Sequence, residues 1–400
     1  MAIKLTKRVS GIAESATLAI SAKAKQLKAE GKDIVNFGVG EPDFNTPDYI
    51  IEAAYTAMKD GRTKYTPASG ITELKKAVVE ETERATGLKY SPSQVVIGAG
   101  AKQPLYNAIA ATIEEGDEVV IPSPYWVTYP ELVKYCGGKC VFAETKPQNG
   151  YKMTAEELES VITDNTRALI LNSPNNPTGA VYSEDELKSI AKVIEKHGLY
   201  VISDEIYEKL VYGGAKHYSI ACCSDYMKEH TVVVNGVSKS YSMTGWRIGY
   251  FAAPRDIAKA AASMQSHTAS NPCSISQYAS VEALTSPESD KFISEMQKTF
   301  DERRKYMVEV LQNTENVVCI EPKGAFYVFA DVSACYGKKF NGTPINGSLS
   351  FADAALNKGV AVVPGLAFGD DKCIRLSYAI SLADIKEGLE RLKLFIKELK

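Results

Sequence analysis

The segment Val232–Tyr250, VVVNGVSKSYSMTGWRIGY, joins a short hydrophobic run to a lysine and an arginine. The β-branched residues Val232–Val234 predict a buried strand, and Asn235-Gly236 predicts the turn that ends it. Lys239 follows this turn, and Arg247 lies eight residues further on. A lysine amine forms Schiff bases with aldehydes, and a guanidinium binds phosphate oxygens in pairs. The segment therefore suits a cofactor that carries an aldehyde and a phosphate. A solvated turn lysine beside a surface arginine would have the same sequence pattern.

The composition of the chain limits its class and its partners. It has 400 residues, 45% hydrophobic and 24% charged, which is typical of a globular protein and long enough to favour two domains. The net charge is −3 without a basic run, so a nucleic-acid-binding surface is not indicated. No stretch reaches the ~20 apolar residues of a membrane span, and the N-terminus lacks the apolar segment of a secretory signal.

The cysteines and histidines indicate neither a disulfide framework nor a metal site. Eight cysteines are scattered along the chain, and neither Cys136 and Cys140 nor the adjacent Cys222-Cys223 has a partner pair at zinc-binding spacing. The four histidines are isolated in the sequence, so no Ser-His-Asp triad is indicated either. We therefore expect a cytoplasmic protein with reduced thiols and no bound metal.

Short β-rich runs alternate with helical patterns through most of the chain. This alternation is typical of βαβ units, which build a mostly parallel sheet flanked by helices. We predict an α/β fold with a large domain at residues 46–290 and a smaller α+β domain made of residues 1–45, which include an N-terminal arm, and 291–400. The expected strands are Asp33–Phe37, Val95–Gly98, Glu118–Pro122, Lys139–Ala143, Ala168–Asn172, Tyr200–Ser203, Thr231–Asn235, Val317–Ile320, Gly324–Asp331, Val360–Val363 and Cys373–Tyr378. The expected helices are Ala16–Glu30, Asp48–Asp60, Ile71–Thr86, Lys102–Ile113, Val127–Val133, Ala155–Ile162, Glu184–Lys196 and Lys291–Leu311, with one more at the C-terminus.

Several predicted strands end in loops that suit a ligand, and in open α/β sheets ligands bind at such strand ends. The loop Gly98–Gln103, GAGAKQ, precedes a helix whose first N–H groups would be free for a phosphate. Trp126 offers a ring for stacking, and Asn176 offers an amide. Asp204 follows an apolar strand, where a buried carboxylate needs a cation such as a protonated ring nitrogen. Each feature alone also fits a packing turn, a core aromatic or a structural carboxylate.

Seven motifs are spread along the chain in a fixed order: GEPDF at Gly40–Phe44, KYTP at Lys64–Pro67, PYW at Pro124–Trp126, NNPTG at Asn175–Gly179, SDEIY at Ser203–Tyr207, SKSYSMTGWRIG at Ser238–Gly249 and RLSYA at Arg375–Ala379. Together they resemble the motifs of pyridoxal-phosphate-dependent aminotransferases of fold type I. The chain is similar to the bacterial aspartate aminotransferases along nearly its whole length. This resemblance implies the fold of PLP-dependent transferases, with pyridoxal 5'-phosphate (PLP) as cofactor.

The resemblance also implies roles in cofactor binding and catalysis. Lys239 would hold the cofactor as a Schiff base and carry the proton that leaves the substrate Cα. Asp204 would pair with the pyridine nitrogen, while Tyr207 and Asn176 would hydrogen-bond the phenolic oxygen of the ring. Trp126 would stack on the ring. The residues implied to hold the phosphate are Arg247, Ser238 and the backbone of Gly100, Ala101 and Lys102, with Tyr65 reaching the phosphate of the other subunit in a homodimer with shared sites.

A second set of residues is implied to bind the substrate. Arg375 would grip the α-carboxylate bidentately, with the backbone of Gly40 closing over it. A dicarboxylate needs a second cation, which Lys102 would supply, and Ser15 and Thr17 would add hydroxyl donors; the alternative is that Lys102 is a solvated helix residue. Trp126 and Asn176 would also face the substrate.

The resulting interpretation is an aspartate transaminase that moves an amino group from L-aspartate, or a similar amino acid, to 2-oxoglutarate. Two positions depart from the family pattern: Ala101 replaces a frequent second glycine, and Ala13 replaces the basic residue of relatives that also accept prephenate. The alternatives are an aromatic or alanine aminotransferase and a PLP-dependent carbon–sulfur β-lyase. A PLP-sensing transcription regulator would need a DNA-binding segment, for which Met1–Glu30 is too short.

Overall fold

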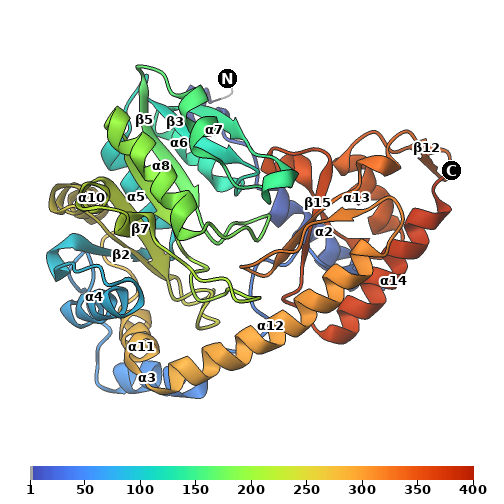
Figure 1. Ribbon diagram of the computed structural model, residues 1–400. Helices are drawn as coiled ribbons and strands as arrows, with labels where there is room; N and C mark the ends of the chain where they lie inside the picture. The colour runs from blue at the N-terminus through green and yellow to red at the C-terminus, as the bar shows by residue number, and fades with distance from the viewer. Residues whose placement is uncertain (1–2) are drawn as a thin grey trace.

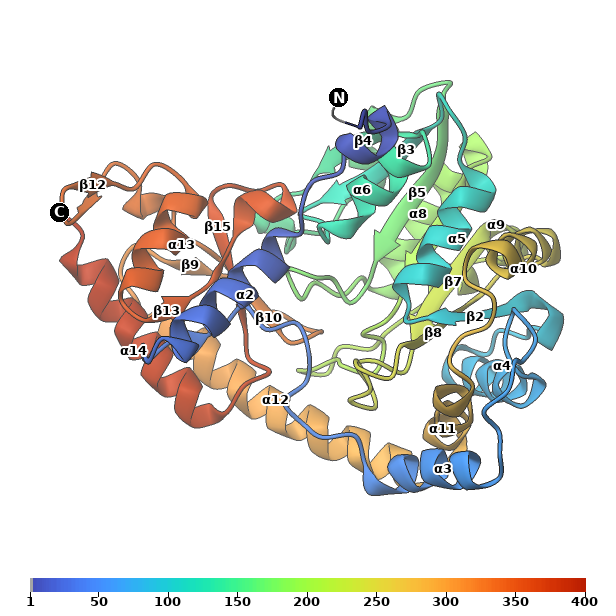
Figure 2. The same cartoon turned by 180° about the vertical axis from the view of Figure 1, so that it is seen from behind.

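The computed structural model describes residues 3–400, which form two lobes joined by the long helix α12 (Glu288–Gln312) (Figures 1 and 2). The larger lobe contains a seven-stranded sheet, and the smaller lobe contains a four-stranded antiparallel sheet. Residue 290, the predicted end of the large domain, lies in the first turn of α12. The domain boundaries themselves stay a prediction. Within residues 3–400, no helix is both long and apolar enough to cross a membrane.

The central sheet confirms the predicted α/β class. Its strand order is β2-β8-β7-β6-β5-β3-β4. All neighbouring strands are parallel except the two pairs that include β8, which is antiparallel to both β2 and β7. The strand β8 was not predicted, because its apolar run is short and follows directly on Arg247. The strands are β2 (Val95–Ala99), β3 (Glu118–Ser123), β4 (Lys139–Glu144), β5 (Thr166–Asn172), β6 (Tyr200–Asp204), β7 (Thr231–Gly236) and β8 (Ile248–Ala252).

Both faces of this sheet are buried, because successive side chains of a strand point to opposite faces. In β3, Val119 and Ile121 pack in a cluster with α5 (Lys102–Thr112) and α10 (Arg255–Thr268), whereas Val120 packs with α8 (Glu184–His197). The other helices of the large lobe are α3 (Asp48–Lys59), α4 (Thr72–Thr86), α6 (Thr128–Tyr135), α7 (Ala155–Val161), α9 (Asp225–His230) and α11 (Ser274–Thr285).

The smaller lobe is built on the sheet β14-β15-β10-β9 and packs against α12. The single strand predicted at Val360–Val363 is in fact two short strands, because the chain leaves β1 at Ala361 and pairs with β15 from Val363. The remaining elements are β1 (Val35–Asn36), β9 (Val318–Cys319), β10 (Tyr327–Asp331), β11 (Lys339–Phe340), β12 (Thr343–Pro344), α13 (Ser348–Asn357), β13 (Val360–Ala361), β14 (Val363–Pro364), β15 (Cys373–Ser377) and α14 (Leu382–Glu398).

The N-terminal arm contacts both lobes (Figure 2). Its helix α2 (Ala16–Ala29) packs on the smaller lobe through Ala24 and Leu27. The preceding helix α1 (Lys7–Ser10) lies near α6 of the larger lobe, where the Ala13 N–H donates a hydrogen bond to Glu131 at 3.0 Å. The start of α2 is thereby held between the lobes.

Candidate active site

A cavity of about 340 Å³ lies where the two lobes meet, beside the carboxyl ends of β2, β5 and β6. This volume is in the usual range for a small-molecule site. The predicted site residues line it, except Gly100 and Tyr65. Those that line the cavity are Ser15, Thr17, Gly40, Ala101, Lys102, Trp126, Asn176, Asp204, Tyr207, Ser238, Lys239, Arg247 and Arg375.

Lys239 lies in the loop after β7, as predicted, and its amine faces the cavity. Its Nζ donates a hydrogen bond to the Gly40 carbonyl at 2.7 Å. Burial lowers the pKa of Lys239 to about 8, and the positive charges of Arg247 and Arg375 act in the same direction. A lysine with this pKa is neutral in about a tenth of the molecules at pH 7, far more than an ordinary lysine, and the neutral amine is the form that attacks an aldehyde.

Arg247 and Gly100 form a cradle beside this lysine. Arg247 has a positive φ of 56°, and its guanidinium donates to the carbonyls of Thr244 at 2.9 Å and Ala99 at 3.2 Å. A Cβ at Gly100 would lie 2.2 Å from Arg247 Nη2, so only glycine allows the guanidinium to lie on this backbone. The helix α5 begins next to it at Lys102, and its first N–H groups have no helical acceptor. This combination suits a phosphate dianion.

Asp204 ends β6 and is 4% exposed. Its Oδ2 accepts a hydrogen bond from the Tyr129 hydroxyl at 2.8 Å, and its Oδ1 accepts one from the Ile206 N–H at 3.2 Å. Burial raises the pKa of Asp204 to about 6, while these two donors lower it. The carboxyl group is therefore mostly ionised at neutral pH and needs a cation in the cavity. Sequence reasoning missed Tyr129, although it lies only three residues after Trp126, in the first turn of α6.

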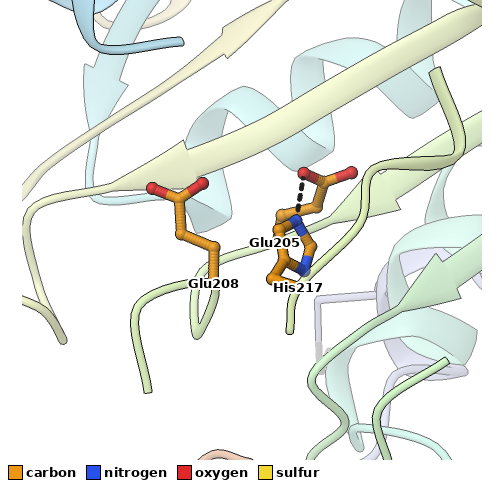
Figure 3. Close-up of side chains that lie close together, drawn as sticks. All are labelled: Glu205, Glu208 and His217. Atoms are coloured by element: carbon orange, nitrogen blue, oxygen red, sulfur yellow. Dashed lines mark hydrogen bonds and ion pairs between the residues drawn. The ribbon is translucent and has the colours of Figure 1, made fainter. Parts of the chain in front are cut away.

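Glu205 follows this aspartate in the chain but does not line the cavity. Its carboxylate accepts hydrogen bonds from the hydroxyls of Ser203 at 2.8 Å and Ser219 at 2.6 Å, and lies 2.9 Å from His217 Nε2 (Figure 3). His217 is isolated in the sequence, but the fold brings it next to this glutamate. Glu208 is close to this pair, and burial raises its pKa. Because Glu205 is already bonded to three side chains, the group is best explained as a buried ion pair.

Arg375 is the buried cation on the opposite lobe, in β15, with 2% of its surface exposed. It donates hydrogen bonds from Nη1 to Asn176 Oδ1 at 3.0 Å and from Nη2 to the Gly38 carbonyl at 3.1 Å. Its Nε has no partner, and no carboxylate pairs with it, among the residues that the structure describes. A buried guanidinium in this state is ready to bind a carboxylate ligand.

Tyr207 and Tyr327 connect this arginine to the rest of the site. The two hydroxyl oxygens lie 3.0 Å apart, and both tyrosines line the cavity. The ring centroid of Tyr327 is 4.3 Å from the Arg375 guanidinium carbon. Sequence reasoning did not select Tyr327, because a tyrosine in an apolar strand has the same pattern whether it faces a core or a cavity.

Lys102 is a second cation at the cavity wall. Its Nζ lies 5.0 Å from the Trp126 ring centroid, and no carboxylate within residues 3–400 pairs with it. Burial lowers the pKa of Lys102, and the charge of Arg247 adds to this effect. Ser15 and Thr17 line the same cavity from the start of α2, with their hydroxyl oxygens 3.0 Å apart. The three residues predicted to bind the distal carboxylate of a substrate, Lys102, Ser15 and Thr17, thus line the same cavity.

Comparison with known proteins identifies the family. The pattern of the aminotransferase class I and II family matches residues 32–392, which is most of the chain. The chain belongs to this family. The aspartate aminotransferase of Bacillus subtilis (strain 168) is 46% identical over 401 residues, covering 99% of this chain and 100% of that protein. The aspartate aminotransferase structure from Rhizobium meliloti has a TM-score of 0.96 at 42% identity and covers 100% of both chains. A Thermus thermophilus aspartate aminotransferase with maleate has a TM-score of 0.93 at 41% identity, covering 98% of this chain and 100% of that one.

Aminotransferases of this family use PLP, and this site fits that cofactor. The fit rests on the amine of Lys239, the buried carboxylate of Asp204 and the cradle that a Cβ at Gly100 would fill. The predicted family, fold class and cofactor are confirmed. The individual residue roles stay predictions. Tyr65 is 91% exposed and does not line the cavity of its own chain.

Proposed function

We propose that this aminotransferase moves the amino group of L-aspartate to 2-oxoglutarate. One observation carries the proposal: besides Lys239 and Arg247, which are assigned to the cofactor, the same cavity is lined by two further cations without a carboxylate partner among the described residues, Arg375 and Lys102. Two such cations suit a substrate with two carboxylates. The names of the relatives described above support the same donor.

The proposed chemistry depends on the state of two residues. PLP, when bound, supplies an aldehyde that combines with amines and a ring that takes up the electron pair left at Cα. Lys239 would hold the aldehyde carbon of the cofactor and would serve as the base for the proton at Cα, because burial lowers the pKa of its Nζ to about 8. Asp204 would balance a positive charge on the ring nitrogen, because Tyr129 and the Ile206 N–H favour its ionised form.

Substrate orientation is assigned to the two cations. Arg375 would bind the α-carboxylate through the N–H groups that face the cavity. The hydrogen bond from its Nη1 to Asn176 Oδ1, 3.0 Å long, fixes the orientation of the guanidinium plane. Lys102 would bind the distal carboxylate, with the hydroxyls of Ser15 and Thr17 as further donors. Both ends of the dicarboxylate would then be fixed while Cα lies near Lys239.

We also propose a homodimer in the cytoplasm. Tyr65 is 91% exposed, and Ile51, Tyr55 and Met58 on α3 are each more than 40% exposed, which is typical of an apolar interface. In such a dimer Tyr65 would reach the phosphate of the other subunit. All eight cysteines are free thiols in the described chain, which suits a reducing compartment.

The proposed function is tested by single-turnover spectra with a panel of amino acids. Loss of the visible absorbance of the lysine-bound cofactor should be fastest with aspartate and glutamate, and at least tenfold slower with alanine and phenylalanine. Faster reaction with alanine or aromatic donors would favour those aminotransferases instead. Release of pyruvate and ammonia from cystathionine without a keto acid would favour the β-lyase.

A further inference from the structure

Tyr327 occupies a position that connects both ends of the site. It is the first residue of β10 in the smaller lobe and is 1% exposed. In the register of β10 and β15, Tyr327 is opposite Ser377, two residues from Arg375 on the same face of the sheet. An aromatic side chain reaches such a diagonal neighbour. The position of the ring is therefore fixed by strand pairing rather than by a mobile loop.

The ring of Tyr327 supports the Arg375 guanidinium. Its centroid lies 4.3 Å from the guanidinium carbon, nearer than the Phe368 centroid at 5.0 Å. Within residues 3–400 no carboxylate pairs with this buried cation, so aromatic faces and two oxygen acceptors stabilise it. A cation over an aromatic face gains more when it is desolvated, and Arg375 is only 2% exposed.

The hydroxyl of Tyr327 reaches the other end of the site. Its oxygen is 3.0 Å from the Tyr207 hydroxyl oxygen, which is also buried and lines the cavity. Burial raises the pKa of both phenols, so each hydroxyl keeps its single proton at neutral pH. A hydroxyl that accepts a hydrogen bond can still donate its own proton elsewhere. If Tyr327 donates, the proton of Tyr207 remains available to a ligand in the cavity.

We infer that Tyr327 is a positioning residue that couples the Arg375 carboxylate clamp to the Tyr207 hydroxyl. Its ring orients the guanidinium, and its hydroxyl donates to Tyr207 and directs the Tyr207 proton toward the cofactor oxygen. This inference rests on the roles proposed for Tyr207 and Arg375. It predicts two separable effects, because the ring and the hydroxyl can be removed one at a time.

The hydroxyl is tested with Tyr327→Phe, which keeps the ring. The readout is the pH midpoint of the visible absorbance of the resting, cofactor-loaded enzyme. If the phenolic oxygen of the cofactor receives a weaker hydrogen bond from Tyr207, that oxygen becomes more basic and its proton is lost only at higher pH. The midpoint should therefore rise, by about one pH unit or less, since a neutral hydrogen bond is worth on that order. Tyr207→Phe should raise it further, and adding Tyr327→Phe to that variant should change nothing more.

Tyr378→Phe is the matched control for this experiment. Its hydroxyl is also buried and donates to the Ala325 carbonyl at 3.2 Å, but Tyr378 does not line the cavity. This variant should leave the midpoint unchanged. An unchanged midpoint in Tyr327→Phe, with a raised one in Tyr207→Phe, would overturn the hydroxyl coupling alone. An unchanged midpoint in Tyr207→Phe would refute the proposed role of Tyr207, and the inference with it.

The ring is tested by the binding of maleate, a dicarboxylate without an amino group, followed by absorbance. Tyr327→Phe should bind maleate within about twofold of the wild type. Tyr327→Leu should bind it roughly tenfold more weakly, since it removes a buried cation–π contact. Tyr327→Met provides a second ring-free variant if the leucine variant does not fold. Wild-type affinity in a folded ring-free variant would overturn the support of Arg375 by Tyr327.

Discussion

Replacement of Lys102 by methionine tests the choice of substrate. Methionine keeps most of the apolar stem of the lysine and removes the charge. Lys102 has no carboxylate partner among residues 3–400, so no protein ion pair is broken by this change. The expected loss of kcat/KM is therefore confined to substrates that place a carboxylate near this amine. Aspartate and glutamate meet that condition, and alanine does not.

The size of the loss follows from the environment of the amine. Two unit charges 4 Å apart attract by about 4 kcal/mol at an effective dielectric of 20, and by about 1 kcal/mol in water. Lys102 lies between these limits, because nearby protein atoms lower the pKa of its amine although the residue as a whole is exposed. A hydrogen bond to a charged group is worth about 1.5–3 kcal/mol. We therefore expect a roughly ten- to hundredfold fall in kcat/KM for dicarboxylic donors.

The assay compares kcat/KM for aspartate, glutamate and alanine in the same enzyme preparation. Loss of the contact between Lys102 and the Trp126 ring would affect all donors alike, so the ratio of aspartate to alanine isolates the distal carboxylate. Lys23→Met is a matched control, because Lys23 is exposed on α2 and does not line the cavity. Equal losses with all three donors would refute the role of Lys102 in substrate choice.

Three further predictions concern the other charged groups of the site. Arg375→Lys should weaken every amino-acid substrate by a similar factor, roughly tenfold or more, because a point charge cannot match both carboxylate oxygens; KM values that rise only for dicarboxylates would mean that Arg375 binds the other carboxylate. Since the pKa of Lys239 is lowered to about 8, the rate at which cofactor-free enzyme recombines with PLP should rise about tenfold per pH unit below pH 8 and level off above it; a rate that still rises steeply beyond pH 9 would show an ordinary lysine. Asp204→Asn should lower kcat by roughly a hundredfold or more while the protein remains folded, as checked by its melting temperature; retained kcat together with lost stability would indicate a structural carboxylate.

Much of the large lobe could be predicted from sequence, because its signals are local. The predicted bounds of β7 and α8 are nearly correct, and in the structure α8 begins at a capping box formed by Ser183 and Glu186. Because ligands of open α/β sheets bind at the carboxyl ends of the strands, Asp204 and Lys239 were expected at one edge of the sheet. In contrast, α9 and α13 were not predicted, since a six-residue helix and a weakly patterned one lack a clear period.

The rest of the site depends on contacts between distant segments. Nothing in the spacing of Ser15, Thr17 or Arg375 places them beside Lys239; only the resemblance to known aminotransferases did so. Tyr327 was missed even so, because its role arises from strand register and from a neighbour 120 residues away. The pairing of His217 with Glu205 was not predicted for a similar reason, since the two residues are 12 positions apart in the sequence.

The central claim is that Lys239, among the lysines of the chain, carries the cofactor. Reduction of the PLP-loaded enzyme with borohydride makes the link between amine and cofactor permanent, and peptide mass spectrometry then locates it. We predict one label per chain on the peptide that contains Lys239, and no such label in a Lys239→Ala variant that still binds PLP. A label on Lys102 or another lysine, with Lys239 unmodified, would contradict the account.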